Sequence, residues 1–362
     1  MTWAVAGGGT GGHVTLALAL AEEIRRRGGD VFLLGTDRGL ERQIVPRAGF
    51  ELITFEARPV MGQRRVARLR AGLGLLAATL EARRVLRARR VRGVLSVGGY
   101  ASLPAVAAAT LSRIPTALVE PNAIPGRTNR LMARFAGRVF TGFREARGHL
   151  PVAEERVREH GVPLRRDLVE ACASRAPRRP APPYHLLVAG GSQGARQLNE
   201  GMRAVLAELD PTTFEIFHQS GRDDRARVEE AYRKAGFRAE VVEFTDDLPA
   251  RYAWADLAVC RAGALTVAEL AVAGLPALLV PYPYAADDHQ AANAQVLAEC
   301  GGALVLGSRP LVPAALASAL RGLLAEPERI LAMRRALADR ARPDAARAIV
   351  DDCAEVFGAM TG

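Results

Sequence analysis

The sequence lacks several features that would define its class at once. No uninterrupted apolar run reaches the length of a membrane span, so we expect no transmembrane helix. The 4 cysteines of the 362-residue chain are scattered, with no CxxC pair and no clustered histidines, which argues against a disulfide framework and a zinc site. The first apolar run leads straight into glycines with no basic region before it, so we expect no signal peptide.

Lysine is nearly absent: Lys234 is the only one, and arginine supplies nearly all of the formal net charge of +10. A basic excess can indicate binding to nucleic acid or to an anionic membrane surface. The interleaved aromatic pattern of a single-strand binder and a helix-turn-helix are both missing, so we expect no nucleic-acid partner. The composition is globular, with 49% hydrophobic residues, and the length is sufficient for two domains.

The most informative stretch runs from Asp256 to Asn293. A strand over Asp256–Cys260 is followed by a helix over Thr266–Ala273, with Glu269 in its first turn, and by a strand over Leu275–Val280. In such a βαβ unit the loops after both strands lie on one edge of a parallel sheet. Open α/β folds bind their ligands at that edge.

The polar residues of these two loops suit a nucleotide sugar. The helix start after Gly263 can hold a phosphate, and Glu269 can accept hydrogen bonds from the vicinal hydroxyls of a ribose. Gln290 and Asn293 carry amides that suit sugar hydroxyls. Alternatively, Glu269 only complements the helix dipole and the two amides are ordinary surface groups. We favour the nucleotide-sugar pocket because the whole set falls on one edge.

The N-terminus predicts a second ligand-binding edge. A strand over Thr2–Ala6 leads into the glycine loop Gly7–His13 and a helix over Val14–Arg27. The loop contains G-x-G-x-x-G, which alone is a weak sign of a dinucleotide site. The helix dipole favours the neutral form of His13, as a general base requires, although a histidine that merely caps or packs fits equally well. Further along the chain, the loop Glu120–Asn129 follows another strand. Its side chains Glu120, Asn122 and Asn129 can bind sugar hydroxyls, and we expect them on the same edge of the sheet as the Gly7–His13 loop.

Both halves of the chain open in the same way. Val5-Ala6-Gly7-Gly8 and Val188-Ala189-Gly190-Gly191 each run from a strand into a glycine loop, and residues 176–183 form a proline-rich stretch that predicts a linker. We therefore expect an α/β protein of two doubly wound parallel-sheet domains that face each other across a cleft. The predicted domains are residues 1–163 and 164–340, with a helix in residues 341–362 that packs back on the first domain.

The segment Arg58–Arg92 places arginines on both sides of the apolar run Leu73–Leu80. This pattern is typical of a helix that lies on anionic lipid headgroups. An ordinary amphipathic helix with a solvated basic face is the alternative. We favour the membrane because the charges bracket the apolar run.

Seven motifs, in register over essentially the whole chain, resemble one enzyme family. It comprises the peptidoglycan N-acetylglucosaminyltransferases, which move N-acetylglucosamine from UDP-N-acetylglucosamine to the C4 hydroxyl of the muramyl sugar of undecaprenyl-linked lipid I and form lipid II. The motifs are Gly7–His13, Val97–Tyr100, Glu120–Asn129, Gly190–Ala195, Tyr252–Asp256, Arg261–Glu269 and His289–Asn293.

The resemblance implies a GT-B fold and an inverting transfer without metal or cofactor, at the cytoplasmic face of the cell membrane. Arg58–Arg92 would bind anionic lipids of the inner membrane. Other enzymes of cell-wall synthesis are protein partners that the resemblance leaves open. His13 and Glu120 would be catalytic, with the role of base shared or disputed between them. The substrate contacts that the resemblance implies are Thr10, Gly11, Gly12, Asn122, Arg165, Ser192, Thr245, Ala264, Leu265, Thr266, Val267, Ala268, Glu269, Gln290 and Asn293.

The chain departs from the family pattern at three places: Val14–Ala17, where a proline often follows the histidine, Val119–Asn122 and Val162–Arg165. These departures put the geometry of the acceptor loop in doubt. Rival predictions are a UDP-sugar 2-epimerase, a glycosyltransferase acting on diacylglycerol, a catalytically silent UDP-sugar-binding scaffold at the membrane, and an NAD oxidoreductase. The basic apolar segment argues against the epimerase, and ligand-edge motifs in both halves argue against the oxidoreductase.

Overall fold

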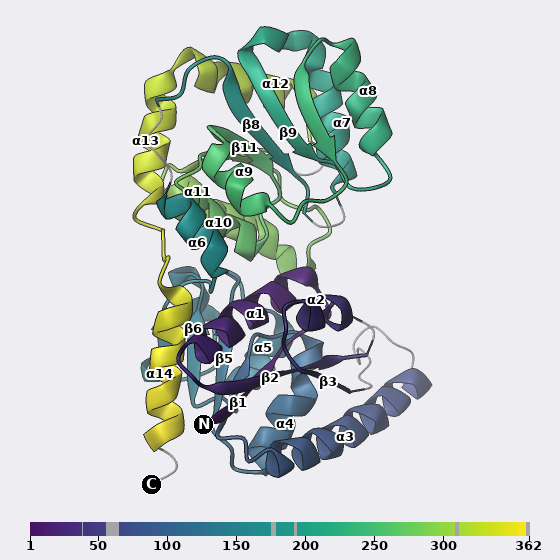
Figure 1. Cartoon of the computed structure of the whole chain (residues 1–362), viewed down its shortest axis with the longest axis vertical. Helices are drawn as coiled ribbons and strands as arrows, with labels where there is room; N and C mark the ends of the chain where they lie inside the picture. The colour runs from purple at the N-terminus through teal and green to yellow at the C-terminus, as the bar shows by residue number, and fades with distance from the viewer. Residues whose placement is uncertain (38, 56–64, 175–178, 192–193, 308–310, 360–362) are drawn as a thin grey trace. The chain divides into compact units, whose positions relative to one another are not determined.

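A computed structural model describes residues 1–37, 39–55, 65–174, 179–191, 194–307 and 311–359, except for the side chains of 65–71, 286 and 359. The chain divides into two compact units, Met1–Arg165 with Pro343–Gly362, and Arg166–Arg342 (Figure 1). Within the described ranges, no helix is long and apolar enough to cross a bilayer.

The proline-rich stretch at residues 176–183 does not lie between the units, so the predicted linker is wrong. The division falls after Arg165, and α6 (Arg166–Ala173) already belongs to the second unit. Residues 175–178 lie outside the described part of the chain. The prolines that are described, Pro180–Pro183, fall inside the second unit and lead into its first strand.

The first unit is built on a parallel sheet of seven strands in the order β3-β2-β1-β4-β5-β6-β7. The order reverses between β1 and β4, and open α/β sheets bind ligands beyond the carboxyl ends of the strands at this reversal. The strands are β1 (Thr2–Ala6), β2 (Asp30–Thr36), β3 (Leu52–Phe55), β4 (Gly93–Ser96), β5 (Thr116–Glu120), β6 (Arg138–Thr141) and β7 (Val157–Glu159).

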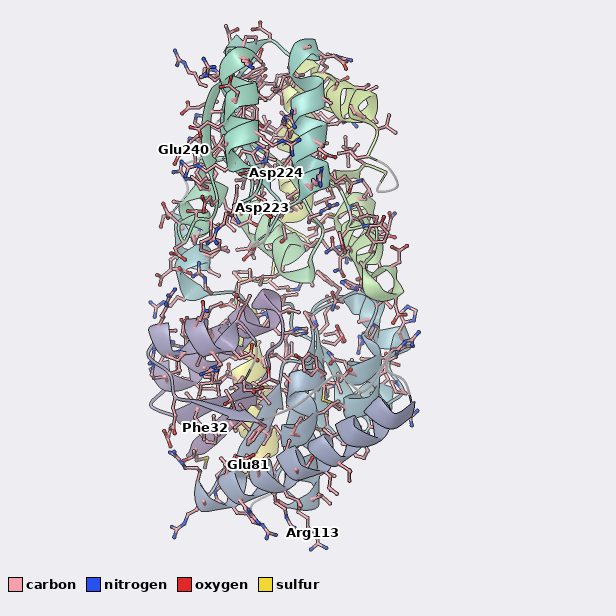
Figure 2. All side chains as sticks on the ribbon, turned by 90° about the vertical axis from the view of Figure 1, so that its right-hand side faces the viewer. Phe32, Glu81, Arg113, Asp223, Asp224 and Glu240 are labelled. Carbon is pink, nitrogen blue, oxygen red and sulfur yellow. The ribbon has the colours of Figure 1, made fainter. Side chains whose placement is uncertain are left out.

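Helices cover both faces of this sheet, which is why its strands are continuous apolar runs in the sequence. Figure 1 shows α1 and α2 on one face and α3 and α4 on the other. Phe32 of β2 is 2% exposed in the core that Ala78, Ala82 and Leu86 of α3 close, whereas Glu81 is exposed (Figure 2). The helices are α1 (Gly11–Arg26), α2 (Glu41–Arg47), α3 (Arg65–Ala88), α4 (Leu103–Leu111), α5 (Arg127–Ala133) and α14 (Ala345–Ala359).

The last helix, α14, belongs to the first unit although it ends the described chain. The ring of Phe357 packs edge-on against Trp3 of β1, with the ring centroids 4.8 Å apart. Asp351 pairs with Arg27 at the end of α1, and Asp352 pairs with Arg138 at 3.0 Å. An apolar contact and ion pairs thus hold α14 against the first and sixth strands.

The second unit repeats the architecture of the first. Its parallel sheet has six strands in the order β10-β9-β8-β11-β12-β13, so the reversal falls between β8 and β11. The strands are β8 (Tyr184–Ala189), β9 (Phe214–Gln219), β10 (Arg238–Val242), β11 (Leu257–Cys260), β12 (Ala277–Leu279) and β13 (Ala303–Val305). Its other helices are α7 (Arg196–Val205), α8 (Arg225–Lys234), α9 (Leu248–Trp254), α10 (Ala264–Ala273), α11 (His289–Glu299), α12 (Pro313–Ala325) and α13 (Pro327–Leu337).

A buried polar network ties β9 to the two helices α7 and α8. His218 is 0% exposed; its Nδ1 lies 2.9 Å from the Tyr232 hydroxyl and its Nε2 lies 3.0 Å from Asn199 Oδ1. Asn199 in turn donates to Asp224, which precedes α8 (Figure 2). A ring that donates at Nε2 and accepts at Nδ1 is neutral, and burial lowers the pKa of His218 to about 3.

We expect this neutral histidine to weaken the fold in acid. The unfolded chain takes up a proton on His218 near pH 6.5, whereas the folded chain does so only near pH 3. The free energy of unfolding should therefore fall below pH 6.5, by up to about 1.4 kcal/mol per pH unit from this group. An NMR titration checks the cause, with the ring signal assigned by its loss in His218→Gln. A His218 ring that protonates near pH 6 would contradict the prediction.

Candidate active site

The glycine loop after β1 is held by the buried carboxylate of Glu41. The N–H group of Gly9 donates to Glu41 Oε2 at 3.2 Å, and the Thr36 N–H and hydroxyl donate to Oε1 at 3.0 and 2.6 Å. Glu41 is 1% exposed at the start of α2. Burial alone would raise its pKa, but the hydrogen bonds from Thr36 and Gly9 overcome that effect and lower it. Glu41 is therefore a buried anion that fixes the loop.

His13 lies in the first turn of α1, which begins at Gly11 rather than at the predicted Val14. Thr10 is the N-cap, and its hydroxyl accepts from the backbone N–H of His13 at 3.4 Å. The same hydroxyl oxygen lies 2.8 Å from Nδ1 of the His13 ring. If Nδ1 carries the proton and donates to Thr10, the lone pair is on Nε2, and the ring can act there as a base.

Glu120 is the hub of the neighbouring loop. Its carboxylate is 0% exposed and accepts from the Asn122 N–H at 2.8 Å, the Asn122 amide at 3.1 Å, the Gly126 N–H at 3.2 Å and the Asn129 amide at 2.8 Å. Burial raises the pKa of Glu120 to about 7, and the hydrogen bonds from Asn122, Asn129 and Gly126 oppose that rise. Because all of these partners donate, they fit the ionised form.

A second glycine loop, at Gly98 and Gly99, lies between the Glu120 hydrogen bonds and His13. Asn129 Oδ1 accepts from the Gly99 N–H at 3.3 Å, and the Gly98 and Gly99 φ angles are +93° and +80°. A Cβ atom on Gly99 would lie 3.6 Å from Nδ1 of His13. The loops after β1, β4 and β5 are therefore linked at one edge of the sheet, the edge on which the sequence places His13, Glu120 and Asn122.

In the second unit, helix α10 begins at Ala264, two residues before the predicted start. Glu269 consequently lies in the second turn instead of the first. Glu269 is 9% exposed, and its carboxylate accepts from the Tyr252 hydroxyl at 2.9 Å. The residues Ala264 to Glu269 thus follow the carboxyl end of β11, with Gly263 as an extended N-cap that offers no side-chain hydrogen bond to the helix.

Arg261 links the loops after β11 and β12. Its Nη1 donates to Gln197 at 2.9 Å and to the Val280 and Pro281 carbonyls at 3.1 Å each. Gln290 Oε1 accepts from the backbone N–H groups of Tyr282 at 2.9 Å and Ala262 at 3.3 Å. The oxygen of Gln290 is thereby engaged by the protein, and its amide NH₂ is the group suited to a ligand.

The remaining predicted residues occupy varied positions. Asn293 is 0% exposed and donates to the Ala262 carbonyl at 3.2 Å, so it braces the same loop. Thr245 follows β10, and its hydroxyl accepts from the Asp247 N–H at 3.0 Å. Arg165 is the half-buried last residue before the second unit. Ser192 lies outside the described residues.

Two side chains that were not predicted as site residues support these loops, although Tyr252 opens one of the family motifs. Glu41 and Tyr252 contribute the side-chain hydrogen bonds to Gly9 and Glu269. A glutamate at the start of a helix normally indicates only a favourable helix dipole. The glycines around Glu41, at positions 35 and 39, were the one available signal. Over the described ranges, no group of three or more His, Cys, Asp or Glu residues could hold a metal ion.

Comparison with known proteins identifies the family. Residues 3–141 match the Glycosyltransferase family 28 N-terminal domain, and residues 185–349 match the Glycosyltransferase family 28 C-terminal domain. The chain belongs to glycosyltransferase family 28. A relative from Anaeromyxobacter sp. (strain Fw109-5), "UDP-N-acetylglucosamine--N-acetylmuramyl-(pentapeptide) pyrophosphoryl-undecaprenol N-acetylglucosamine transferase", is 45% identical over 98% of this chain and 93% of its own length. The protein of that name from Geobacter metallireducens is 42% identical over 96% of each chain.

Solved structures confirm the predicted fold class. The crystal structure of Acinetobacter baumannii MurG has a TM-score of 0.79 and 31% identity, and the match covers 97% of this chain and 98% of that one. UDP-GlcNAc 2-epimerase from Neisseria meningitidis has a TM-score of 0.67 over 98% of this chain and 100% of that one, but only 13% identity, which shows a shared fold alone. Two parallel-sheet α/β domains of the GT-B type are therefore established for this family 28 chain.

We expect Glu120→Gln to destabilise the first unit. The amide NH₂ would face N–H donors that the carboxylate now satisfies, and a buried unsatisfied pair of donors should lower the free energy of unfolding by about 2–3 kcal/mol. Denaturant unfolding measures this. Glu154→Gln is the matched control, because Glu154 is 83% exposed in the same unit. Equal stability of the two variants would contradict the role of Glu120 as a hub.

Proposed function

We propose that this chain transfers N-acetylglucosamine from UDP-N-acetylglucosamine to the C4 hydroxyl of the muramyl sugar of lipid I, with inversion, and so forms lipid II. One combination of features carries the proposal. In one unit, His13 follows a glycine loop and its ring contacts the hydroxyl of Thr10; in the other, the buried Glu269 follows the uncapped start of α10. The Anaeromyxobacter relative, which is 45% identical and is named as an N-acetylglucosamine transferase with these two substrates, supports the same reaction.

The second unit supplies groups for the donor. The backbone N–H groups at the start of α10 have no side-chain cap, and the positive end of the helix suits a diphosphate. Glu269, oriented by Tyr252, accepts from the ribose hydroxyls, and the Gln290 amide donates to a hydroxyl oxygen of the sugar. Thr245, Arg165 and the Gly190–Ala195 loop complete the donor contacts in this proposal.

The first unit supplies the base. The C4 hydroxyl attacks the anomeric carbon while Nε2 of His13 takes its proton, and the C1–oxygen bond to UDP breaks with the electron pair leaving on the diphosphate. We assign the proton transfer to His13, because both oxygens of Glu120 already accept hydrogen bonds from the protein. Glu120 then acts by holding Asn122 and Asn129 in place. The helix start at α10 stabilises the charge that develops on the leaving diphosphate.

Separate variants test the two half-sites. His13→Ala should lower kcat by about 10²–10⁴-fold, the usual contribution of a general base, and leave the Kd for UDP-N-acetylglucosamine nearly unchanged. Glu269→Ala should instead raise that Kd by about tenfold or more, since it removes hydrogen bonds to a charged group. Steady-state kinetics and calorimetric titration give the two quantities.

The exposed residues His149 and Glu299 serve as matched controls. His149→Ala and Glu299→Ala should leave both kcat and Kd close to the values of the wild type. A parallel collapse of donor binding and turnover in His13→Ala would rule out the assignment of the base.

We also propose that the protein docks peripherally on the cytoplasmic face of the cell membrane through α3. Leu73, Leu76 and Leu80 are 61%, 56% and 45% exposed. They lie opposite the buried face of Ala78, Ala82 and Leu86, and the exposed Arg84 and Arg87 continue the leucine face at helical spacing. Residues 58–64 of the predicted docking segment lie outside the described part. An apolar stripe followed by arginines suits anionic lipid.

Substitution of the stripe should weaken membrane binding. Leu76→Ser with Leu80→Ser removes two leucine side chains from the contact, and partial burial of each contributes about 1 kcal/mol, so the partition coefficient onto phosphatidylglycerol vesicles should fall at least tenfold. Vesicle sedimentation measures it. Val312→Ser, at a position 52% exposed in the second unit, is the control and should bind as the wild type does. Undiminished binding of the double variant would contradict docking through α3.

A further inference from the structure

Glu41 is buried in a place that several glycines make available. A Cβ atom on Gly8 or on Gly39 would collide with the Glu41 carboxylate, and one on Gly35 would lie 3.0 Å from its Cγ. Gly8 belongs to the glycine loop after β1, whereas Gly35 and Gly39 flank the end of β2. The absence of side chains at these positions makes room for one carboxylate between two strand ends.

The two oxygens of Glu41 share the N–H of Gly9, and only one of them also binds Thr36. Oε1 accepts from the Thr36 N–H at 3.0 Å and the Thr36 hydroxyl at 2.6 Å. Oε2 accepts from the Gly9 N–H at 3.2 Å, and the same N–H also approaches Oε1 at 3.3 Å. Gly9 has a φ of +84°, a conformation that a glycine loop does not hold by itself. Glu41 thus connects the end of β2 to the glycine loop.

The residue after Gly9 contacts the ring of His13. Thr10 caps α1 and places its hydroxyl 2.8 Å from His13 Nδ1. We propose that Glu41 is a positioning residue for the transfer: it fixes Gly9, and through Gly9 and Thr10 it sets the orientation of the His13 ring. This inference rests on the proposed role of His13 as the base. Glu41 itself touches neither substrate, because it is 1% exposed.

The substitution Glu41→Gln separates the two halves of the contact. Its amide oxygen, in the place of Oε1, can keep both bonds from Thr36 and the longer bond from Gly9, but its NH₂ replaces Oε2 and faces the N–H of Gly9, so the loop loses the nearer of its two acceptors. Gly39→Ala gives a second variant, in which the carboxylate stays in the chain and a methyl group displaces it from its place. Glu51→Gln is the matched control, since Glu51 is 48% exposed in the same unit.

A double-mutant cycle on kcat tests the inference. We expect Glu41→Gln to lower kcat at least tenfold in the wild type but less than twofold in a His13→Ala background, because the residue acts through the ring. Gly39→Ala should show the same dependence on His13, and Glu51→Gln should leave kcat within twofold. Losses that multiply fully in the double variant would overturn the inference, since they would mean that Glu41 acts independently of His13.

A second readout needs no substrate and keeps the inference separate from the proposed function. In ¹⁵N-labelled protein, Glu41→Gln should move the His13 ring signals, while Glu51→Gln should not. Unchanged His13 signals in a folded Glu41→Gln variant would overturn the positioning role, whether or not the wild type transfers sugar. A wild type without transfer but with the ring shift would instead reject the proposed reaction and leave the link from Glu41 to His13 standing.

Discussion

The loops that carry the candidate chemistry in the first unit depend on buried carboxylates that accept backbone N–H groups. Glycine loops gain the positive φ angles they need for close approach but lose more conformational entropy on ordering than other segments. Glu41 holds the loop after β1 through Gly9, and Glu120 holds the loop after β5 through Asn122 and Gly126. Each carboxylate loses hydration on burial; the donated hydrogen bonds outweigh that loss in lowering the pKa of Glu41, and they oppose it only in part for Glu120, whose pKa is raised. The loops on either side of His13 are thus held by carboxylates that are themselves buried.

The second unit uses the same sheet order for a different purpose. Its loops follow β8, β11 and β12, and Glu269 receives a hydroxyl donor, Tyr252, instead of a ring of backbone N–H groups. Side chains brace the adjacent segments from within: Arg261 binds two carbonyls, and Asn293 binds a third. The first unit therefore carries His13, the proposed base, in the first turn of α1, and the second carries the uncapped start of α10 and a carboxylate that suit a nucleotide sugar in the proposal.

Much of the fold followed from local pattern, because strands buried on both faces are continuous apolar runs. The strands β3, β7 and β13 were not predicted: each lies at an edge of its sheet and is only partly buried, unlike the central strands. Helices α1 and α10 begin two or three residues before their predicted starts. Helix α1 opens with two glycines, which carry no apolar period, so its N-cap Thr10, and not the pattern, sets the start. The linker prediction failed because prolines also lead into strands.

The candidate site was predictable only for residues that directly follow a strand in the sequence. His13, Glu120 and Glu269 each follow an apolar run and therefore had to lie at a carboxyl edge. The role of Asn293 could not be found in this way, because its full burial under Ala262 arises from packing between α11 and the loop after β11. Glu41 could not be predicted either, because its contact with Gly9 also arises from packing and joins residues 32 positions apart.

The measurement that tests the account most directly is a transfer assay with purified protein, UDP-N-acetylglucosamine and polyprenyl-linked lipid I, in EDTA, with UDP-glucose as the competing donor. The account predicts lipid II with a β-linked N-acetylglucosamine on the C4 oxygen, from an α-linked donor, and little transfer of glucose. An α-linked product, equal use of UDP-glucose, or formation of an epimerised UDP-sugar with no lipid product would contradict it.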